Sequence, residues 1–426
     1  MEFLENPTST EKRTCVIDAE FDISAVIQAQ SVLCHLQPII SIREGRVIGL
    51  EALARATNPI SGKPIPPEYL FHAATQFKQA RTLDKLCRET SLRSFSDLCE
   101  LDKDIILFIN LDVSMLDESV ASSTALIELA NRFNIPPERI VIEFIESKIR
   151  DERALQAFLK SHRKHGFLIA LDDMGAGHSN LERIPTIKPD IIKLDRSLIA
   201  GIDREYHKQE LFDFFIKLAH KIGVIVVAEG IETEAEALCC LERGADLVQG
   251  FYFARPQVPG RKCLTSGLDR AGALRRILKD HMVANFLKRK QLYQRYNDIA
   301  GRICAVMEMS PTDDREAMLE SAIARFPMVE CAYLIHESGR QITRTVLNPE
   351  RAHRKRTALF GPATAGGDQS AKDYFLFLDQ NQRRYVTDPY VSVVSGNVCV
   401  TISNRVNLGP GQSFVVCVDI IVSEAE

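Results

Sequence analysis

Two adjacent carboxylates, Asp172 and Asp173, end the apolar run of the segment IALDDMGAGHSNL (169–181). Neighbouring negative charges at the mouth of a buried strand repel each other, and burial adds a desolvation cost to each charge. A cation held against both carboxylates would relieve this repulsion. The stretch therefore predicts a cation site at the end of a strand, followed by a glycine-rich turn.

Further polar residues stand at or near the ends of other apolar runs. They are Glu51, Asn110, Glu143, Lys193, Glu229 and Gln249. Any one carboxylate after a strand is, taken alone, better interpreted as the N-cap of the next helix. Several carboxylates gathered at one edge, however, need more positive charge than a single lysine supplies.

Divalent metal would supply that charge. The ligand set is hard oxygen without cysteine or histidine, which favours Mg²⁺ or Mn²⁺ over zinc. Two adjacent aspartates suit two ions with one carboxylate between them. Such a pair activates a water and stabilises the oxygens of an in-line phosphoryl displacement. The pattern predicts a two-metal phosphodiesterase site, although a barrel enzyme acting on another phosphate ester would also fit it.

Alternating strands and helices between about residues 30 and 256 must position these side chains. The expected strands are 32–40, 46–54, 105–111, 139–145, 167–173, 191–195, 224–230 and 247–254, and the expected helices include 68–77, 124–133, 154–165, 210–222 and 233–244. A short turn joins the first two strands as a hairpin, and the rest indicates a parallel sheet. We predict an α/β fold: a TIM-like (β/α)8 barrel with an antiparallel first strand pair, whose site lies at the carboxyl rim.

Composition narrows the remaining possibilities. The 426 residues suffice for a barrel and a further module, and the net charge of −4 gives no sign of binding to a nucleic acid duplex. The start MEFLENPTST is too polar for a signal peptide, and no apolar run approaches a membrane span. The eleven cysteines include no CxxC pair, so we expect reduced thiols in a cytoplasmic protein.

An ordered series of motifs resembles the EAL domain, the bacterial cyclic di-GMP phosphodiesterase module. The series opens with QPIISIREGRVIGLEALAR (37–55), which contains the eponymous Glu51-Ala52-Leu53. It continues with FINL (108–111), EFIES (143–147), DDMGAGHSNL (172–181), KPDIIKLDRSLI (188–199), VVAEGIET (226–233) and VQGFYFARP (248–256). A lone EAL tripeptide would mean nothing, but this series spans about half the chain.

The resemblance implies a role for each matching residue. Metal ligands would be Glu51, Asn110, Glu143 and Asp172 for one ion and Asp172, Asp173 and Glu229 for the second. Lys193 would contact the attacking water or the phosphate, and Glu229 could serve as general base. Gln37, Arg55 and Gln249 would bind substrate, and Glu146 would anchor the loop after Asp173. The implied reaction is hydrolysis of cyclic di-GMP to linear pGpG with two Mg²⁺ or Mn²⁺ ions, and the implied assembly is a homodimer.

The loop after Asp173 departs from the family pattern DDFGTGYSSL. Met174, Ala176, His178 and Asn180 replace Phe, Thr, Tyr and Ser. Because hydrogen-bonding groups are lost there, an alternative stays open: a weak or inactive receptor that binds cyclic di-GMP and signals through partner contacts. All expected metal ligands are nevertheless present, which favours the enzyme.

The second half of the chain changes character. Helical periodicity runs from about 268 to 307 with a basic polar face, which predicts a connecting helix rather than a membrane-binding or nucleic-acid-binding one. The expected strands 331–338, 340–348, 396–407 and 413–422 predict an α+β domain, with 349–371 as a polar segment over a pocket.

That last domain resembles PAS-like sensor domains of the PDC or Cache type through YVTDPYVSVVSGNVCVTIS and GQSFVVCVDI. The resemblance implies a pocket for an unknown small ligand, with Arg384, Tyr390 and Asp419 as candidate lining residues. A dimerisation module without ligand is the alternative. The expected organisation is an N-terminal extension (1–27), an EAL barrel (28–260), connecting helices (261–307) and a PAS-like sensor domain (308–426).

Overall fold

The chain folds into two units, which divide after Met282. The computed structural model describes residues 22–112, 124–145, 151–176, 181–309, 314–349, 363–378, 382–392, 395–408 and 413–422. Each unit is considered separately below.

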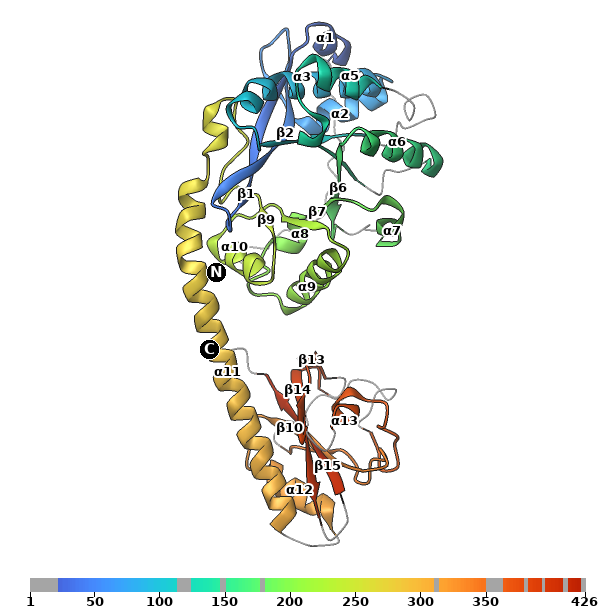
Figure 1. Cartoon of the computed structure of the whole chain (residues 1–426), viewed down its shortest axis with the longest axis vertical. Helices are drawn as coiled ribbons and strands as arrows, with labels where there is room; N and C mark the ends of the chain where they lie inside the picture. The colour runs from blue at the N-terminus through green and yellow to red at the C-terminus, as the bar shows by residue number, and fades with distance from the viewer. Residues whose placement is uncertain are drawn as a thin grey trace, which may run out of the picture. The chain divides into compact units, whose positions relative to one another are not determined.

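A nine-stranded sheet in the first unit closes into a barrel, and helices surround its strands (Figure 1). The strands are β1 Val32–Ser41, β2 Arg46–Thr57, β3 Pro64–Ile65, β4 Ile106–Asn110, β5 Ile140–Ile145, β6 Leu168–Met174, β7 Ile191–Leu194, β8 Ile225–Ala228 and β9 Leu247–Val248. β1 runs antiparallel to both β2 and β9, and β3 pairs with β2 outside the ring. Neighbouring strands from β2 through β4 to β9 are parallel. The predicted barrel with an antiparallel first pair is confirmed.

Helices cover the outside of the barrel because each presents an apolar stripe. They are α1 Ile23–Gln28, α2 Pro67–Gln76, α3 Ala80–Leu101, α5 Ala125–Arg132, α6 Glu152–Lys164, α7 Ile184–Ile187, α8 Arg196–Ile199, α9 Tyr206–Lys221 and α10 Glu234–Glu242, with 3-10 turns at Pro137–Arg139, Leu181–Arg183 and Arg261–Leu264. In α6, Leu155, Phe158 and His162 recur every three or four residues and are buried. Asp151 caps this helix by accepting a 3.0 Å hydrogen bond from the Ala154 amide.

A layer of apolar side chains packs together within the barrel. Its buried members are Ile39, Phe108, Val141, Ala170, Ile191, Val227 and Leu247, each from a different strand. β2 has glycine where the Phe108 ring needs space: a Cβ on Gly49 would lie 2.4 Å from Phe108 Cε2. The barrel therefore has a solid apolar layer, as expected for eight strands.

The last barrel strand is much shorter than expected from the sequence. β9 contains only Leu247 and Val248, so the predicted strand 247–254 is wrong beyond Val248. The chain turns at Gly250, where a Cβ would lie 2.1 Å from the carbonyl oxygen of Ile231. This close backbone approach ends the strand, and only glycine permits it.

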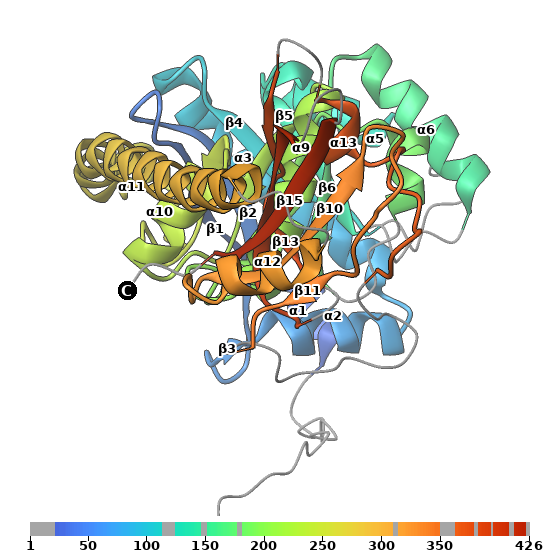
Figure 2. The ribbon, with the colours of Figure 1, turned by 90° about the horizontal axis from the view of Figure 1, so that it is seen from below.

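The second unit is an antiparallel sheet with helices on it (Figure 1, Figure 2). Its strands are β10 Val329–His336, β11 Val346–Leu347, β12 Arg384–Val386, β13 Tyr390–Val391, β14 Val398–Asn407 and β15 Ser413–Ile421, in the order β11-β10-β15-β14-β12 with β13 on β14. Its helices are α12 Arg315–Ile323, α13 Asp373–Leu376 and the latter part of α11 Leu268–Met309. The predicted strands 331–338, 396–407 and 413–422 correspond to β10, β14 and β15, whereas the predicted strand 340–348 is reduced to Val346–Leu347.

The two faces of this sheet carry different cores. Ile299 and Ile303 of α11 pack with Val400 and Val418 on one face. Tyr333, Val415 and Leu378 pack on the other. Successive strand residues point to opposite faces, so each long strand contributes to both cores.

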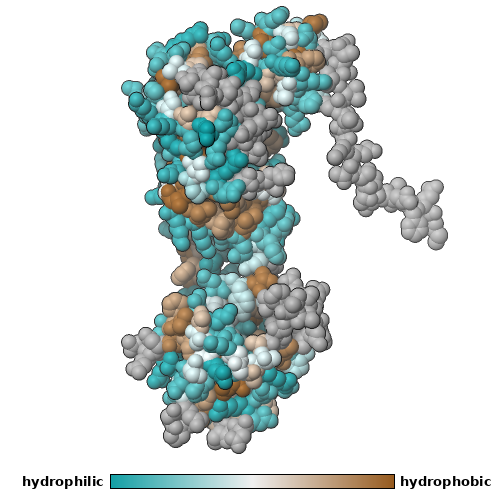
Figure 3. Space-filling view, turned by 90° about the vertical axis from the view of Figure 1, so that its right-hand side faces the viewer, coloured by the Kyte–Doolittle hydropathy of each residue, from teal (hydrophilic) through white to brown (hydrophobic). Residues whose placement is uncertain are grey.

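Hydrophilic side chains cover most of the face drawn in Figure 3, interrupted by apolar patches on both units. Within the described ranges, no helix combines the length and apolarity that crossing a membrane requires.

Candidate active site

The predicted site residues of the barrel form a polar layer next to the apolar one. Side chains two positions apart on a strand face the same way. Each of these residues lies two positions along the chain from a residue of the apolar layer, on the side of the carboxyl rim. The pairs, polar residue first, are Gln37 and Ile39, Asn110 and Phe108, Glu143 and Val141, Asp172 and Ala170, Lys193 and Ile191, Glu229 and Val227, and Gln249 and Leu247. Glu51 stands in the same relation to Gly49. The barrel therefore brings these eight residues to its rim.

Lys193 lies at the centre of this layer and is fully buried. Its Nζ is 2.7 Å from Glu143 Oε1 and 2.7 Å from Glu229 Oε1. It is also 3.3 Å from Asp172 Oδ1 and 3.4 Å from Glu51 Oε1. One ammonium group thus pairs with four carboxylates from four strand ends.

Three side-chain amides complete the layer, and two of them contact its carboxylates. Gln249 Nε2 donates to Glu51 Oε2 at 2.6 Å. Asn110 Nδ2 lies 3.3 Å from Glu143 Oε2 and 3.5 Å from Glu51 Oε1. Gln37 Nε2 donates to the Ala254 carbonyl oxygen at 3.1 Å, which holds Gln37 beside the segment after β9. These bonds fix the orientation of Glu51 and Glu143.

The site has more negative charge than its lysine can balance. Burial raises the pKa of Glu143 well above its usual value; Lys193 opposes this, and Glu51, Asp172 and Glu229 add to it. The pKa of Glu229 is raised in the same way. Burial alone would lower the pKa of Lys193, but the surrounding carboxylates raise it well above its usual value. Lys193 therefore stays charged, and it only partly offsets the burial and the mutual repulsion of the carboxylates.

Divalent cations fit this arrangement. Ligand oxygens of Glu51, Glu143 and Asp172 all lie within 4.8 Å of one another, and all three residues are buried. The donors are carboxylates and an amide, the oxygen ligands that Mg²⁺, Mn²⁺ and Ca²⁺ prefer. A cation would also reduce the carboxylate repulsion that raises the pKa of Glu143.

Asp172 and Asp173 point in different directions although they are neighbours. The pairing of β6 with β7 is irregular between Leu171 and Met174. Asp173 has a φ of +56°, a left-handed conformation that aspartate tolerates better than most residues. Asp172 is buried beside Lys193, and Asp173 is half-buried. The irregularity in the strand therefore places one carboxylate beside Lys193 and the neighbouring one in a more exposed position.

A cavity of about 150 Å³ opens beside the polar layer and is lined by Gln37, Glu51, Glu229 and Gln249. Arg196, Glu232 and Phe251 also line it, and sequence reasoning missed them. Arg196 Nη1 donates to the Gly230 carbonyl oxygen at 2.7 Å and lies 2.8 Å from Glu232 Oε1. The available signal was position: Arg196 and Glu232 each lie three residues beyond a predicted site residue, in the same strand-to-helix connections.

Other predicted residues lie apart from this cavity or beyond the described chain. Arg55 is half-buried on β2 and donates to the Ala54 carbonyl oxygen at 2.8 Å; it does not line the cavity. Glu146, His178 and Asn180 lie outside the described residues. Met174 is fully buried at the end of β6.

The three candidate residues of the second unit are divided between two places. Tyr390 OH bonds to Thr401 Oγ1 at 2.9 Å, and Thr401 Oγ1 donates to Asp419 Oδ1 at 2.8 Å. Burial raises the pKa of Asp419 above its usual value. Arg384 instead donates from Nε to Asn404 Oδ1 at 2.6 Å. Tyr390 and Asp419 thus form one cluster, and Arg384 belongs to another.

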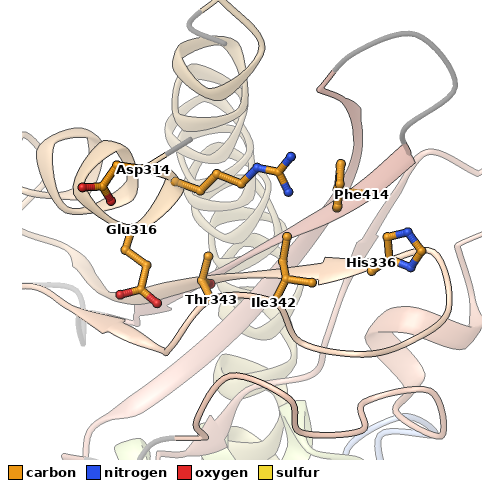
Figure 4. Close-up of a pocket in the computed structure, with 7 residues that line it drawn as sticks. Asp314, Glu316, His336, Ile342, Thr343 and Phe414 are labelled. Carbon is orange, nitrogen blue, oxygen red and sulfur yellow. The ribbon is translucent and has the colours of Figure 1, made fainter. Parts of the chain in front are cut away.

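A separate cavity of about 680 Å³ lies at the start of α12 (Figure 4). Asp314 and Glu316 lie at one end, and His336 and Phe414 lie at the other. The acids already have structural roles: Asp314 caps α12 through the Ala317 amide at 3.0 Å, and Glu316 accepts from Arg344 Nε at 2.9 Å. This cavity therefore gives no reason to assign a site.

Residues 22–256, more than half of the chain, match the family model described as EAL domain. PdeN of Escherichia coli (strain K12), a probable cyclic di-GMP phosphodiesterase, is 29% identical over 239 residues, 55% of this chain and 45% of PdeN. The cyclic di-GMP phosphodiesterase RocR of Pseudomonas aeruginosa is 28% identical over 224 residues, 52% of this chain and 56% of RocR. This chain thus spans about half the length of these curated relatives.

The crystal structure of the Bacillus subtilis YkuI protein, with an EAL domain, in complex with its substrate c-di-GMP and calcium, has a similar fold. Its TM-score is 0.72, and the match covers 95% of this chain and 100% of that chain at 21% identity. At this identity the likeness concerns the fold, and it extends to the C-terminal sheet.

Proposed function

The chain belongs to the EAL-domain family, and from this premise we propose that it is a metal-dependent phosphodiesterase that hydrolyses cyclic di-GMP to linear pGpG. The observation that carries the proposal is the polar layer: four carboxylates and two amides gather around one buried lysine at the barrel rim. Relatives named as cyclic di-GMP phosphodiesterases support the choice of substrate.

In this proposal the layer holds two divalent ions. Glu51, Asn110, Glu143 and Asp172 would hold the first, and Asp172, Asp173 and Glu229 would hold the second. When bound, the two ions supply Lewis acidity to the phosphate and lower the pKa of the attacking water. Mg²⁺ and Mn²⁺ are the proposed ions because all ligands are hard oxygens.

Protein side chains perform the remaining steps. Glu229 accepts a proton from the attacking water, whose oxygen forms a new bond to phosphorus as one phosphodiester P–O bond breaks, and the leaving ribose oxygen takes up a proton from solvent to become a hydroxyl group. Lys193 keeps its proton and donates hydrogen bonds to the water or to a phosphate oxygen. Gln37 and Gln249 line the adjoining cavity and orient the substrate, and Arg55 binds a phosphate further along β2.

The decisive experiment is a hydrolysis assay with Mg²⁺ or Mn²⁺, in which pGpG is resolved by chromatography. We expect product with the unmodified chain and none with Glu51→Ala, because this residue contacts Lys193 and Gln249 and belongs to the carboxylate cluster. The matched control is Glu44→Ala, an exposed acid on the β1–β2 turn that pairs with Arg46. Full turnover in Glu51→Ala would refute the site.

The same assay separates the enzyme from the receptor alternative. A receptor would bind cyclic di-GMP with a measurable heat and release no pGpG with either ion. That outcome would direct attention to the departures at Met174 and Ala176 in the segment after Asp172.

A further inference from the structure

A second pocket, here called the edge pocket, lies where α11 meets the β12–β14 edge of the C-terminal sheet. It encloses about 560 Å³, and its lining includes Gly301 and Glu308 of α11 and Arg383, Arg384, Asn404 and Arg405 of the sheet edge. All these residues belong to the second unit. The pocket is thus separate from the phosphodiesterase site.

The edge pocket is positively charged. Three arginines line it against one glutamate, Glu308. Arg384 Nε donates to Asn404 Oδ1 at 2.6 Å, which fixes the plane of the guanidinium group. A Cβ on Gly301 would lie 3.8 Å from Arg384 Nη2. Because glycine has no side chain, α11 does not cover the guanidinium group at this point. An oriented guanidinium fork with free access suits two oxygens of a carboxylate or phosphate.

A buried donor in the pocket lacks an acceptor. Asn404 is only 6% exposed, and its Nδ2 has no oxygen or nitrogen acceptor among the residues that the structure describes; the side-chain group it faces is the Cys304 thiol, whose sulfur is a weak acceptor. Arg405 Nε also lacks a partner among the described residues, but the Arg405 side chain extends to the other face of β14, where its Nη2 donates to the Leu378 carbonyl oxygen at 2.8 Å, so this nitrogen is not a donor to the pocket. Buried polar groups without partners are rare and costly. The neighbouring Cys304 thiol stays protonated because burial raises its pKa to about 12, so it supplies no competing negative charge.

We propose that the edge pocket binds a small oxyanion, a carboxylate or phosphate group, through the Arg384 guanidinium and the Asn404 Nδ2 amide. Arg383 and Arg405 add favourable charge. The ligand would lie between α11 and the edge of the sheet, on the opposite side of β14 from Thr401, to which Tyr390 bonds. This proposal does not depend on the phosphodiesterase activity.

Calorimetric titration of the full chain tests the proposal. Pyrophosphate and citrate serve as probes of the phosphate and carboxylate classes, and EDTA removes metal ions that could bind them at the barrel. We expect saturable binding of at least one probe, and Arg384→Gln should weaken it about tenfold or more, because a charge-assisted bidentate contact is lost. The matched control, Arg325→Gln, changes an exposed arginine of the same unit and should bind like the unmodified chain.

A second variant keeps all the arginines. Gly301→Asp would place a carboxylate beside Arg384 Nη2 and should abolish binding by occupying the guanidinium group. The probe that binds more tightly identifies the ligand class. The proposal is overturned if neither probe gives saturable heat, if Arg384→Gln binds like Arg325→Gln, or if Gly301→Asp leaves binding unchanged.

Discussion

At the residue scale, Lys193 is the group on which the folded barrel rim depends when metal is absent. Its Nζ lies within 3.4 Å of an oxygen from each of four carboxylates, and its side chain is buried. Removing one partner of a buried ion pair costs about 3–5 kcal/mol, because the remaining charge stays buried and unpaired. Here four charges would remain.

Lys193→Met should therefore lower the free energy of unfolding by about 3–5 kcal/mol in EDTA. Mg²⁺ or Mn²⁺ should restore much of this loss, since the cations would take over the charge balance. Urea unfolding with and without metal measures both effects. Equal stability of the variant and the unmodified chain in EDTA would show that the carboxylates do not need the lysine.

A second residue-scale prediction concerns His162, which is buried in α6. Its ring stacks on the Phe158 ring with 3.8 Å between the ring centroids, and its Nδ1 lies 2.9 Å from the Phe158 carbonyl oxygen. Burial lowers the pKa of His162, and the hydrogen bond to Phe158 only partly opposes this. The unfolded chain therefore takes up a proton at higher pH than the folded chain does.

His162 thus contributes stability above its unfolded pKa of about 6.5, and this contribution is lost as the pH falls below that value. His162→Gln, which cannot titrate, should show a weaker loss of stability between pH 7 and pH 5. The difference in slope is at most about 1.4 kcal/mol per pH unit. Urea unfolding at several pH values measures it, and parallel profiles would contradict the prediction.

The site could be predicted from the sequence largely because its residues lie at strand ends. Each apolar run supplied one interior residue and, two positions nearer the rim, one polar residue. Arg196 and Glu232 could not be found in this way, because they lie beyond the strands, at the start of α8 and in the β8–α10 connection, where the two-residue alternation of a strand does not apply. Arg384 was predicted to line one pocket together with Tyr390 and Asp419. The alternation of β12 instead sends Arg384 to Asn404 and its neighbour Tyr385 to Phe377, a ring 5.2 Å away.

At the element scale, the shortness of β9 decides where Gln249 lies. The strand ends at Val248 because the backbone at Gly250 must pass close to Ile231. A pattern of apolar residues in the sequence gives no indication of such a backbone contact, which explains why the strand was predicted to continue. β11 was also overpredicted: the segment 340–348 is rich in β-branched residues, but only Val346 and Leu347 form a strand with β10.

Gly250→Ala should therefore both destabilise the chain and reduce turnover. The added Cβ would lie 2.1 Å from a backbone oxygen, so the turn must shift and move Gln249 away from Glu51. The expected loss is about 1–3 kcal/mol, typical of overpacking. The control is Gly260→Ala, where nothing lies within 4 Å of the added carbon. Similar unfolding midpoints for the two variants would contradict this account.

At the scale of the whole molecule, the two units can be tested separately. Ala271 and Leu274 of α11 are buried with the barrel core, whereas Ile299 and Ile303 are buried with the C-terminal sheet. Truncation after Met282 therefore leaves the barrel core complete. Removing only 308–426 would instead leave the apolar residues of α11 uncovered.

We predict that a chain ending at Met282 still hydrolyses cyclic di-GMP, but at a rate changed about fivefold or more, or with a changed oligomeric state. Coupling between domains is typically of this size. Chromatographic rate assays and light scattering of both chains provide the measurements. If the two chains hydrolyse cyclic di-GMP at the same rate and assemble with the same number of copies, the C-terminal unit does not regulate the enzyme.

The reversed direction of β1 has a practical consequence for anyone producing this protein. Because Val32 pairs with Ala56, near the carboxyl end of β2, the chain enters the barrel at the same end as the polar layer. A purification tag fused directly to Asp22 would join the chain at that end of the barrel, where its bulk would compete with substrate for the space around the polar layer. Kinetic work should therefore use protein from which such a tag has been cleaved.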